Sequence, residues 1–226
     1  MLQVAHVIAA IEAVAPPSLA EPWDNVGLMF GGRSWPVEHV LLALDPMPAV
    51  IAQGKGLPGV MVITHHPLFF EPMRALVEDD LAYAVVSELA QAHTALYAAH
   101  TNLDKSPACG TALALAEALG FPRPRPLAPW RPGGGEAALS GELASPGLGG
   151  VVELPGETTC GELAALVARK LGARTAQLTG CDRAPARRVA LAAGAGGDML
   201  SLARAAGAEV MLTGELKHHQ ALEAEV

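Results

Sequence analysis

The first apolar residues of the chain repeat with the period of a helix. They recur every three or four positions, at Val4, Val7, Ile8, Ile11 and Val14. This spacing gathers them on one helical face, and Pro16 and Pro17 then stop the helix. Glu12 interrupts the apolar stretch and no Lys or Arg precedes it, which is not the pattern of a signal peptide. The pattern predicts an amphipathic helix at the N-terminus.

Three continuous apolar runs follow, and they differ from the first segment because they lack helical spacing. They cover residues 40–44, 59–64 and 94–99. Between the last two runs, residues 80–92 regain the helical period, with Leu81, Val85, Leu89 and Ala92 on one face. Continuous apolar strands that alternate with helices are typical of a mostly parallel sheet with both faces covered. We therefore expect an α/β fold.

A break in this pattern divides the chain. Residues 121–136 read FPRPRPLAPWRPGGGE, with five prolines followed by three glycines. Because proline disfavours helix in its own and the preceding position, we interpret residues 122–136 as a linker. It separates a first α/β lobe, residues 1–121, from a second, residues 137–226. The second lobe is expected to hold strands near 149–154 and 209–213, a helix over 159–171, and a strand, glycine turn and helix within 187–200.

Composition narrows the classes of function. The chain is 51% hydrophobic with a net charge of −8 and has no dense block of Lys and Arg, which argues against nucleic acid as a partner. Its three cysteines, Cys109, Cys160 and Cys181, form no Cys-x-x-Cys pair, so we expect a reducing compartment and no structural zinc. No apolar run has the roughly 18 residues that a membrane span needs. These features predict a cytoplasmic protein that is not inserted in a membrane.

Polar clusters follow the ends of three predicted strands. The first is Thr64-His65-His66, the second is AHTNLD with His100 and Asp104, and the third is TGELKHH with Glu215, His218 and His219. Ligands bind outside the carboxyl ends of strands in open α/β sheets, so such clusters can meet in space. Imidazole and carboxylate ligands suit divalent metals. The alternative is that these histidines are ordinary hydrogen-bonded loop residues.

Two further segments are irregular, and each can be explained as a structural turn. GAGGD, residues 194–198, follows a strand but matches neither G-x-G-x-x-G nor a Walker A loop. It is either a tight turn with Asp198 at a helix start, or an anion site formed by Gly194, Gly196 and Gly197. EPWDNVGL, residues 21–28, predicts a turn in which Trp23 is a packing anchor and Asp24 an Asx-turn acceptor.

Several motifs together resemble one known family. WDNVGL, THHPLFF, AHTNLD, VALAAGAGGDML and VMLTGELKHHQALEA occur in the order and at the intervals of the family named for NGG-interacting factor three. Its members are also called GTP cyclohydrolase I type 2 homologues or dinuclear-metal-centre hexameric proteins. The resemblance covers nearly the whole chain. It implies two α/β lobes, a toroidal homo-hexamer, and two divalent ions (zinc, iron or manganese) in a cavity at the carboxyl ends of strands.

The resemblance also assigns residues. His65 and His66 match the family's adjacent histidine ligands, and Asp104 matches its bridging aspartate. His100 opens the same motif as Asp104 and is expected beside the site, and Glu215 and His219 are further candidates for residues that support the metal ligands. Residues 23–28 match an N-terminal signature and receive no ligand role.

The chain departs from the family pattern at its end. Family members continue past the segment that matches TGELKHH into a strand and a Gly-His-x-x-Ser/Thr-Glu motif, which supplies another His and Glu ligand. Here the sequence stops at Val226 with no histidine after His219. His219 and Glu223 share the i, i+4 spacing of that pair, but their flanking residues match the earlier helix. We therefore expect a second lobe that lacks its C-terminal end, with weaker metal affinity and lower stability.

These observations lead to two hypotheses about function. The first is a metal-dependent hydrolase in which metal-bound water attacks a nucleotide or another phosphate-bearing small molecule. The second is a metal-binding ring that catalyses nothing and docks partner proteins as a scaffold or regulator. The cyclohydrolase label gives no mechanism by itself, so the sequence leaves open whether the protein is an enzyme.

Overall fold

The computed structural model describes residues 1–130 and 145–225. These residues form two compact units, Met1–Ser106 and Pro107–Val226. The α/β class predicted from the sequence is confirmed, but the division falls earlier in the chain than the proline-rich segment. Residues 107–121, which the sequence analysis assigns to the first lobe, belong to the second unit. Of the predicted linker, residues 131–136 lie outside the described part of the chain.

The first unit contains four strands, α-helices and short 3₁₀ turns. Its elements are α1 (Val4–Val14), η1 (Pro17–Leu19), β1 (Gly27–Phe30), β2 (His39–Ala43), α2 (Pro48–Ile51), η2 (Ala52–Gly54), β3 (Val60–Thr64), α3 (Leu81–Gln91), β4 (Ala95–Ala98) and α4 (Thr101–Asp104). The strands form one sheet in the order β1-β4-β3-β2. The pairs β2–β3 and β3–β4 are parallel, as predicted, whereas β1 runs antiparallel to β4.

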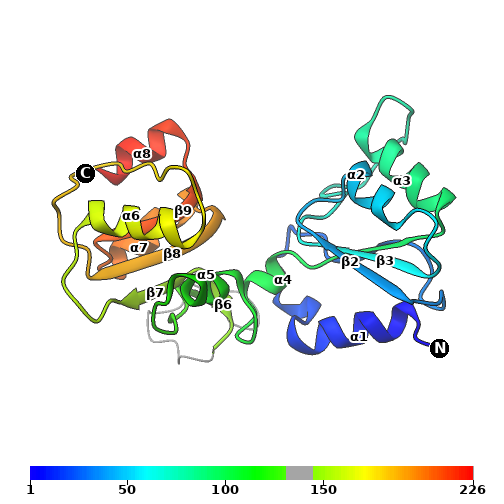
Figure 1. Ribbon diagram of the computed structural model, residues 1–226, viewed down its shortest axis with the longest axis horizontal. Helices are drawn as coiled ribbons and strands as arrows, with labels where there is room; N and C mark the ends of the chain where they lie inside the picture. Colours follow the sequence, from blue (N-terminus) through cyan, green and yellow to red (C-terminus); the bar gives the residue numbers. More distant parts are fainter. Residues whose placement is uncertain (131–144, 226) are drawn as a thin grey trace. The chain divides into compact units, whose positions relative to one another are not determined.

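Helices cover both faces of this sheet. Side chains alternate along the buried strand β3, so its residues contact both layers. Met61 points to the face where Val4 and Ile8 of α1 pack. Val62 points to the other face and contacts a layer that includes Val85 and Leu89 of α3. Figure 1 shows this arrangement, with α1 below the sheet and α2 and α3 above it. The predicted layers of helix, sheet and helix are therefore present in this unit.

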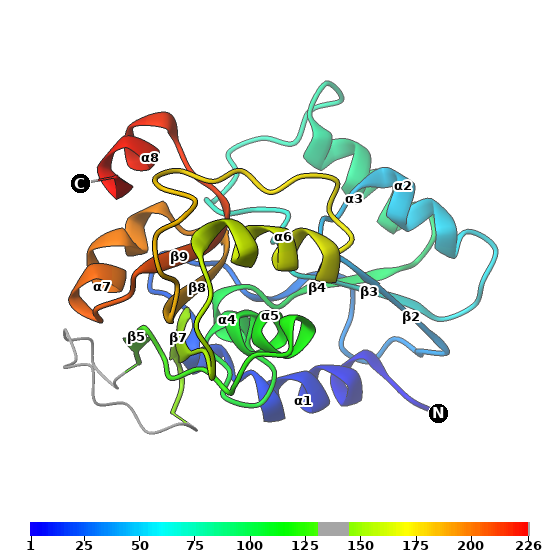
Figure 2. The same cartoon turned by 60° about the vertical axis from the view of Figure 1, so that its left-hand side comes forward.

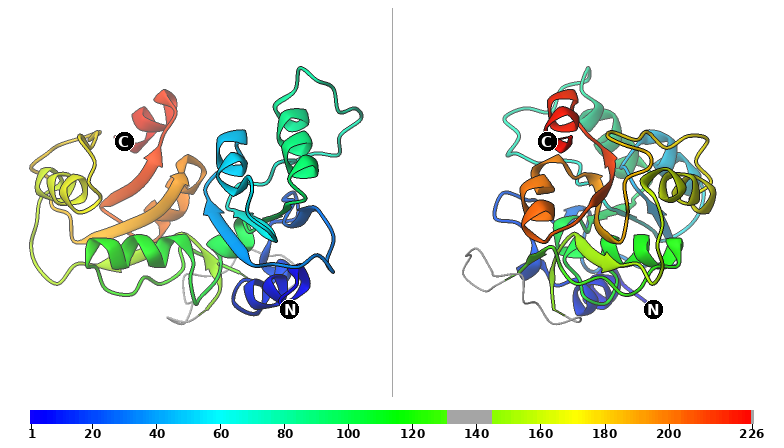
Figure 3. Two further views of the ribbon diagram at one scale, coloured as in Figure 1. Left: turned by 45° about the vertical axis from the view of Figure 1, so that its right-hand side comes forward. Right: turned by 90° about the vertical axis from the view of Figure 1, so that its left-hand side faces the viewer.

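The second unit is built around a smaller, mixed sheet. Its elements are α5 (Thr111–Leu119), β5 (Ala128–Pro129), β6 (Gly147–Leu148), β7 (Gly150–Glu153), α6 (Cys160–Lys170), β8 (Arg188–Ala195), η3 (Gly197–Met199), α7 (Leu200–Ala205), β9 (Val210–Glu215) and α8 (His218–Ala224). The main sheet has the order β7-β8-β9, and β5 pairs with β6 separately. The long strands β8 and β9 run side by side and parallel, as Figure 3 shows, while β7 is antiparallel to β8.

Helices α5 and α6 cover one face of this sheet. Ala116 of α5 and Leu163 of α6 pack in the same buried cluster as Val189 and Leu191 of β8, and Figure 2 shows the two helices side by side. On the other face, Ala190 of β8 packs in a cluster with residues of α7. Because the apolar face of α5 packs on this sheet, the second unit begins near residue 107 and not after the prolines.

Within the described residues, no helix is long and apolar enough to cross a membrane. The three cysteines, Cys109, Cys160 and Cys181, are all free thiols.

Candidate metal centre

The carboxyl ends of two neighbouring parallel strands bring the predicted histidines together. Thr64, the last residue of β3, pairs with Ala98, the last residue of β4. His65 and His66 follow the first strand, and His100 follows the second after a single alanine. The Thr64 hydroxyl donates a hydrogen bond to the His66 carbonyl oxygen over 2.8 Å, which fixes the turn after β3. Strand register therefore decides which imidazoles meet.

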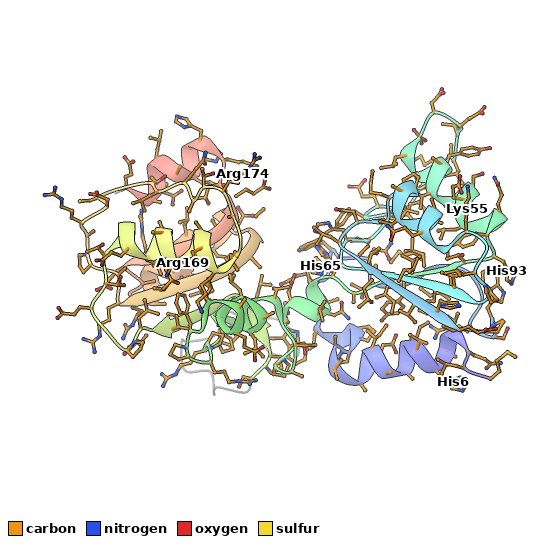
Figure 4. The ribbon with its side chains drawn as sticks, in the orientation of Figure 1. His6, Lys55, His65, His93, Arg169 and Arg174 are labelled. Carbon is orange, nitrogen blue, oxygen red and sulfur yellow. The ribbon has the colours of Figure 1, made fainter. Side chains whose placement is uncertain are left out.

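The three imidazoles form a compact group. One ring nitrogen from each of His65, His66 and His100 lies within 4.8 Å of the other two. The ring centroids are 5.1 Å apart for His65 and His66, 5.0 Å for His65 and His100, and 5.6 Å for His66 and His100. Figure 4 labels His65 at this end of the sheet. Nitrogens this close to one another are able to share a metal ion.

Each imidazole is anchored through the same ring nitrogen. Nδ1 of His65 lies 3.0 Å from the carbonyl oxygen of Ala99. Nδ1 of His66 lies 2.7 Å from a carboxylate oxygen of Asp45, and Nδ1 of His100 lies 2.9 Å from one of Asp24. These oxygens accept a hydrogen bond from Nδ1–H, so in the neutral imidazole Nε2 is the nitrogen without a proton. Histidines that bind metals are oriented in this way, through a hydrogen bond on the nitrogen that faces away from the ion.

Asp24 is the most firmly held of these partners. Its side chain is fully buried, and it accepts hydrogen bonds from the backbone N–H of Thr101, over 3.0 Å, and from the Thr101 hydroxyl. Burial alone would raise the pKa of Asp24. The hydrogen bonds from Thr101 and His100 outweigh that effect and hold the pKa below its ordinary value. Asp24 is therefore a carboxylate at neutral pH and keeps the proton of His100 on Nδ1.

His65 is adapted to stay neutral. Burial lowers its pKa most strongly, and the neighbouring His100 and His66 rings lower it further. The Asp104 carboxylate and the Ala99 hydrogen bond oppose this shift without reversing it. A neutral imidazole is the form that binds a metal.

Asp104 adds a carboxylate to the group. Its Oδ1 lies 3.7 Å from Nε2 of His65, at the end of the short helix α4. Two contacts to other segments hold this helix. Asn102 donates to the carbonyl oxygen of Ala15 over 2.7 Å, and the buried ammonium of Lys105 lies 2.7 Å from a carboxylate oxygen of Glu21. The position of Asp104 is thus fixed by packing around α4.

This donor set fits a divalent cation. Imidazole nitrogens with one carboxylate suit zinc, iron or manganese, and three His ligands could hold a single ion. The anchored Nδ1 atoms add the supporting hydrogen bonds that metal sites use to orient their ligands. The residues present therefore agree with the predicted metal chemistry.

The remaining predicted residues lie in the second unit. Glu215 ends β9 and His219 belongs to α8, so their proposed supporting roles stay predictions. By contrast His100, predicted only to lie beside the site, is a full member of the imidazole group. Within the first unit, the structure brings His65, His66, His100 and Asp104 together.

The glycine turn of the second unit offers little to an anion. The backbone N–H of Gly196 already donates to the hydroxyl of Thr213 over 2.9 Å, and that hydroxyl donates to the Gly194 carbonyl oxygen over 2.8 Å. A hollow of about 240 Å³ beside the turn is lined by two acidic residues, Asp198 and Glu215, and by one basic residue, Lys217. This mixed lining does not favour an anionic ligand, so the site of Gly194, Gly196 and Gly197 remains a prediction without structural support.

Sequence reasoning missed the partners of the histidines. Asp24 was expected only as an Asx-turn acceptor. It accepts from the N–H of the next residue, Asn25, over 2.8 Å, whereas an Asx turn uses the N–H two residues on, so that role stays a prediction. Trp23 was expected to anchor packing, which is wrong because its side chain is 62% exposed. The signal that points to Asp24 is a carboxylate inside an irregular segment rich in polar residues. It gains meaning only when His100 is seen 76 residues further along the chain.

Comparison with known proteins places this chain in a family. A profile of the family described as Duf34/NIF3 (NGG1p interacting factor 3) matches residues 2–226. The chain is 37% identical over 227 residues to a GTP cyclohydrolase 1 type 2 homolog of Streptomyces coelicolor, covering 99% of this chain and 76% of that protein. It is 33% identical over 218 residues to a protein of the same name from Clostridium perfringens, covering 96% and 79%.

A solved structure agrees with these relatives. The crystal structure of Staphylococcus aureus protein SA1388 has a TM-score of 0.87 and 26% sequence identity, covering 99% of this chain and 83% of that one. The class is thus an α/β protein with a candidate histidine metal site. The chain belongs to the Duf34/NIF3 family, which confirms the resemblance read from its motifs.

Proposed function

We propose that this protein binds divalent metal at His65, His66, His100 and Asp104 and hydrolyses a nucleotide or another phosphate-bearing small molecule. The observation that carries the proposal is the convergence of three imidazoles, each anchored through Nδ1 to an oxygen of the protein. Loop histidines without a ligand need one hydrogen-bond partner each and have no reason to present three free nitrogens to one point.

In this proposal, some residues of the first unit bind the metal and others orient the metal-binding residues. His65, His66 and His100 hold the metal, and Asp104, 3.7 Å from His65, is the ligand that two ions would share. Asp24 and Asp45 keep the protons of His100 and His66 on Nδ1. A divalent ion would supply Lewis acidity, which polarises a phosphoryl oxygen and makes nearby water more acidic. Zinc, iron and manganese all suit this donor set.

Metal content and turnover test the proposal separately. The purified chain is stripped with a chelator, reloaded with zinc, manganese or ferrous iron, and its bound metal is counted by mass spectrometry. Release of phosphate or base is then followed with a panel of nucleotides and sugar phosphates. We expect bound metal and turnover in the unmodified protein, and loss of both in His65→Ala and Asp104→Asn.

A matched variant serves as the control for metal that is bound non-specifically by histidines elsewhere. His39→Ala removes an exposed histidine at the start of β2, and it should keep full metal content and turnover. If His65→Ala holds as much metal as His39→Ala, the proposed site is wrong. If metal binding is lost as expected but the unmodified protein turns over no compound in the panel, the hydrolase part fails and the metal site stands.

A ring-forming scaffold is the second candidate function, and one surface favours it. Strand β2 is an edge of the four-stranded sheet, and its outward side chains Val40 and Leu42 are exposed together with the following Leu44, Leu42 by 77%. An exposed apolar edge strand favours association with another chain. A stable metal-loaded hexamer in light scattering, with no turnover in the panel, would favour this candidate over the hydrolase.

A further inference from the structure

Two large aromatic side chains lie against His100 and are open to solvent. The Trp23 ring centroid is 6.2 Å from that of His100, with 72° between the ring planes. The corresponding values for Phe70 are 5.6 Å and 75°. Trp23 is 62% exposed and Phe70 is 50% exposed. Exposed aromatic rings beside a polar, ligand-like cluster are more typical of binding surfaces than of packing.

A hollow adjoins Phe70 and the residues that follow Trp23. It has a volume of about 470 Å³ and is lined by Asp24, Asn25, Phe69, Phe70, Glu71, Pro72 and Met73. Sites for small molecules fall in roughly the range of 300–1,000 Å³ and combine apolar walls with a few polar groups. The hollow therefore has the size and the composition of a pocket for part of a small molecule.

The walls of the hollow are joined to each other and to the imidazole group. The side-chain amide of Asn25 donates to the Phe69 carbonyl oxygen over 2.7 Å, which ties the segment around residue 24 to the segment after β3. Asp24 is among the lining residues of the hollow, and its carboxylate also accepts a hydrogen bond from Nδ1–H of His100. Phe70 lines it too and contacts the same imidazole. A molecule in the hollow would thus lie next to the proposed metal site.

The charges around the hollow indicate which end of a substrate belongs there. The carboxylate of Glu71 belongs to its lining, the buried carboxylate of Asp24 lies behind it, and no Lys or Arg is among its lining residues. A phosphate group is repelled by this surface and is better placed at the cationic metal site. A planar ring with N–H or amino groups suits the hollow, because its faces stack on aromatic side chains and the Glu71 carboxylate offers oxygens to its donors.

We infer that the hollow and the exposed rings of Trp23 and Phe70 bind the planar nitrogen heterocycle of a phosphorylated substrate, as found in a nucleotide. This inference rests on the proposed function, because it places the phosphate end of the same molecule at the metal site. It makes Trp23 and Phe70 specificity residues and gives them no part in binding the metal.

Paired ligands test the inference directly. Adenosine 5′-monophosphate and ribose 5-phosphate carry the same phosphate and sugar, and only the first has a base. Binding of both to the manganese-loaded chain is measured by calorimetry, together with quenching of tryptophan fluorescence. A single base–aromatic stack corresponds to roughly a 5- to 150-fold gain in affinity. We expect the nucleotide to bind at least about fivefold more tightly than the sugar phosphate.

Variants then assign the preference to these rings. Trp23→Leu and Phe70→Leu should reduce the affinity ratio of nucleotide to sugar phosphate, while Trp23→Phe and Phe70→Tyr should retain most of it. Tyr83→Leu removes a partly exposed aromatic residue of α3 and should leave the ratio unchanged. Manganese content is counted in every variant and should match the unmodified protein, which separates this test from that of the metal site.

Several results would overturn the inference. Equal binding of the two ligands by the unmodified protein, no binding of either, or an unchanged ratio in both leucine variants would each do so. A change of oligomeric state in Trp23→Leu without a change in the ratio would show that the rings cover a subunit interface. If manganese is bound and the ratio is as expected but no substrate is hydrolysed, the proposed function fails in its catalytic part while the ring pocket stands.

Discussion

In each unit, polar residues follow a pair of parallel strands, yet among the described residues a cluster of three metal-ligating side chains is found only in the first unit. In the first unit, β3 and β4 finish in register at Thr64 and Ala98, and imidazoles follow both strands. In the second unit, β8 and β9 finish at Ala195 and Glu215 after an irregularity in their register. Glycines and carboxylates follow there, and Thr213 ties up the backbone of the turn.

This difference shows that the topology brings strand ends together, while the side chains at those ends determine whether a metal site can form. Parallel strands deliver their carboxyl ends to one edge in both units. The first unit surrounds that edge with fixed acceptors, Asp24, Asp45 and the Ala99 carbonyl oxygen, which orient the imidazoles. The second unit has its own adjacent pair, His218 and His219, at the start of α8. The two pairs of histidines allow the comparison to be tested.

The largest effect is expected from removing the first pair. The double variant His65→Ala with His66→Ala should lower zinc or manganese affinity by more than about 100-fold, because losing a ligand exceeds the 10–100-fold effect of losing a residue that only orients one. Affinity is measured by calorimetry or by competition with a chromophoric chelator.

The matched control is the double variant His218→Ala with His219→Ala. It removes the same chemistry from the second unit and should change affinity less than about twofold, the change expected when no ligand is lost. An equal loss in the two double variants would show that both pairs bind metal, and the contrast between the units would be wrong.

A smaller effect is expected from the acceptors behind the imidazoles. Asp24→Asn should weaken metal binding by about 10- to 100-fold, because the amide no longer holds the proton of His100 on Nδ1 as a carboxylate does. Asp45→Asn should cost less, since the Asp45 side chain is 50% exposed and that of Asp24 is fully buried, and exposed ion pairs contribute little. Circular dichroism checks that both variants fold. Equal losses would show that burial does not decide how firmly the rings are oriented.

The pH dependence of the first unit should follow His65. Its pKa lies below the ordinary value of 6.5, so the unfolded chain binds more protons than the folded one as pH falls below 6.5. The free energy of unfolding of the metal-free protein should therefore decrease with falling pH in that range, and metal affinity should decrease with it. The pKa of Asp24 lies below 3.8, so this carboxylate stays ionised throughout. Denaturant titrations from pH 8 to about 5 measure the slope, within the range where histidines titrate.

The control for this pH dependence is His65→Gln, which should show a shallower slope because it lacks the titrating ring. A slope that is unchanged in this variant would place the pH dependence elsewhere. A pKa of His65 above 6.5 in a proton NMR titration would contradict the expected sign.

Much of the fold could be predicted from periodicity alone. Continuous apolar runs located β2, β3 and β4, and helical spacing located α1, α3 and α6. The boundary at residues 106 and 107 could not be predicted, because the apolar face of α5 looks the same whichever sheet it covers. The short strand β1 was also missed. It has four residues, pairs antiparallel to β4 and contains an irregularity in its register, so no sustained alternation marks it.

The candidate site likewise contains residues that the sequence predicts and residues that only the tertiary structure reveals. His65 and His66 carry a local signal because they directly follow an apolar strand, and Asp104 belongs to the AHTNLD segment at the end of the next strand. The contribution of Asp24 depends on a contact over 76 residues, which a single sequence does not reveal. The exposure of Trp23 and Phe70 beside His100 is likewise a property of the folded unit. Local patterns thus predict ligands, while their orienting partners require the tertiary structure.

The smallest effect is expected at the start of α6, where the second unit can be weakened alone. The Thr159 hydroxyl accepts from the Glu162 N–H over 3.3 Å, and the Glu162 carboxylate accepts from the Thr159 N–H over 2.9 Å. Thr159→Ala should lower the stability of this unit by about 1 kcal/mol, while Thr159→Ser should retain most of it. Because His65, His66 and His100 lie in the other unit, metal affinity should not change in either variant. Chemical denaturation and metal titration of the same samples measure both, and a parallel loss of metal binding would show that the site depends on the second unit.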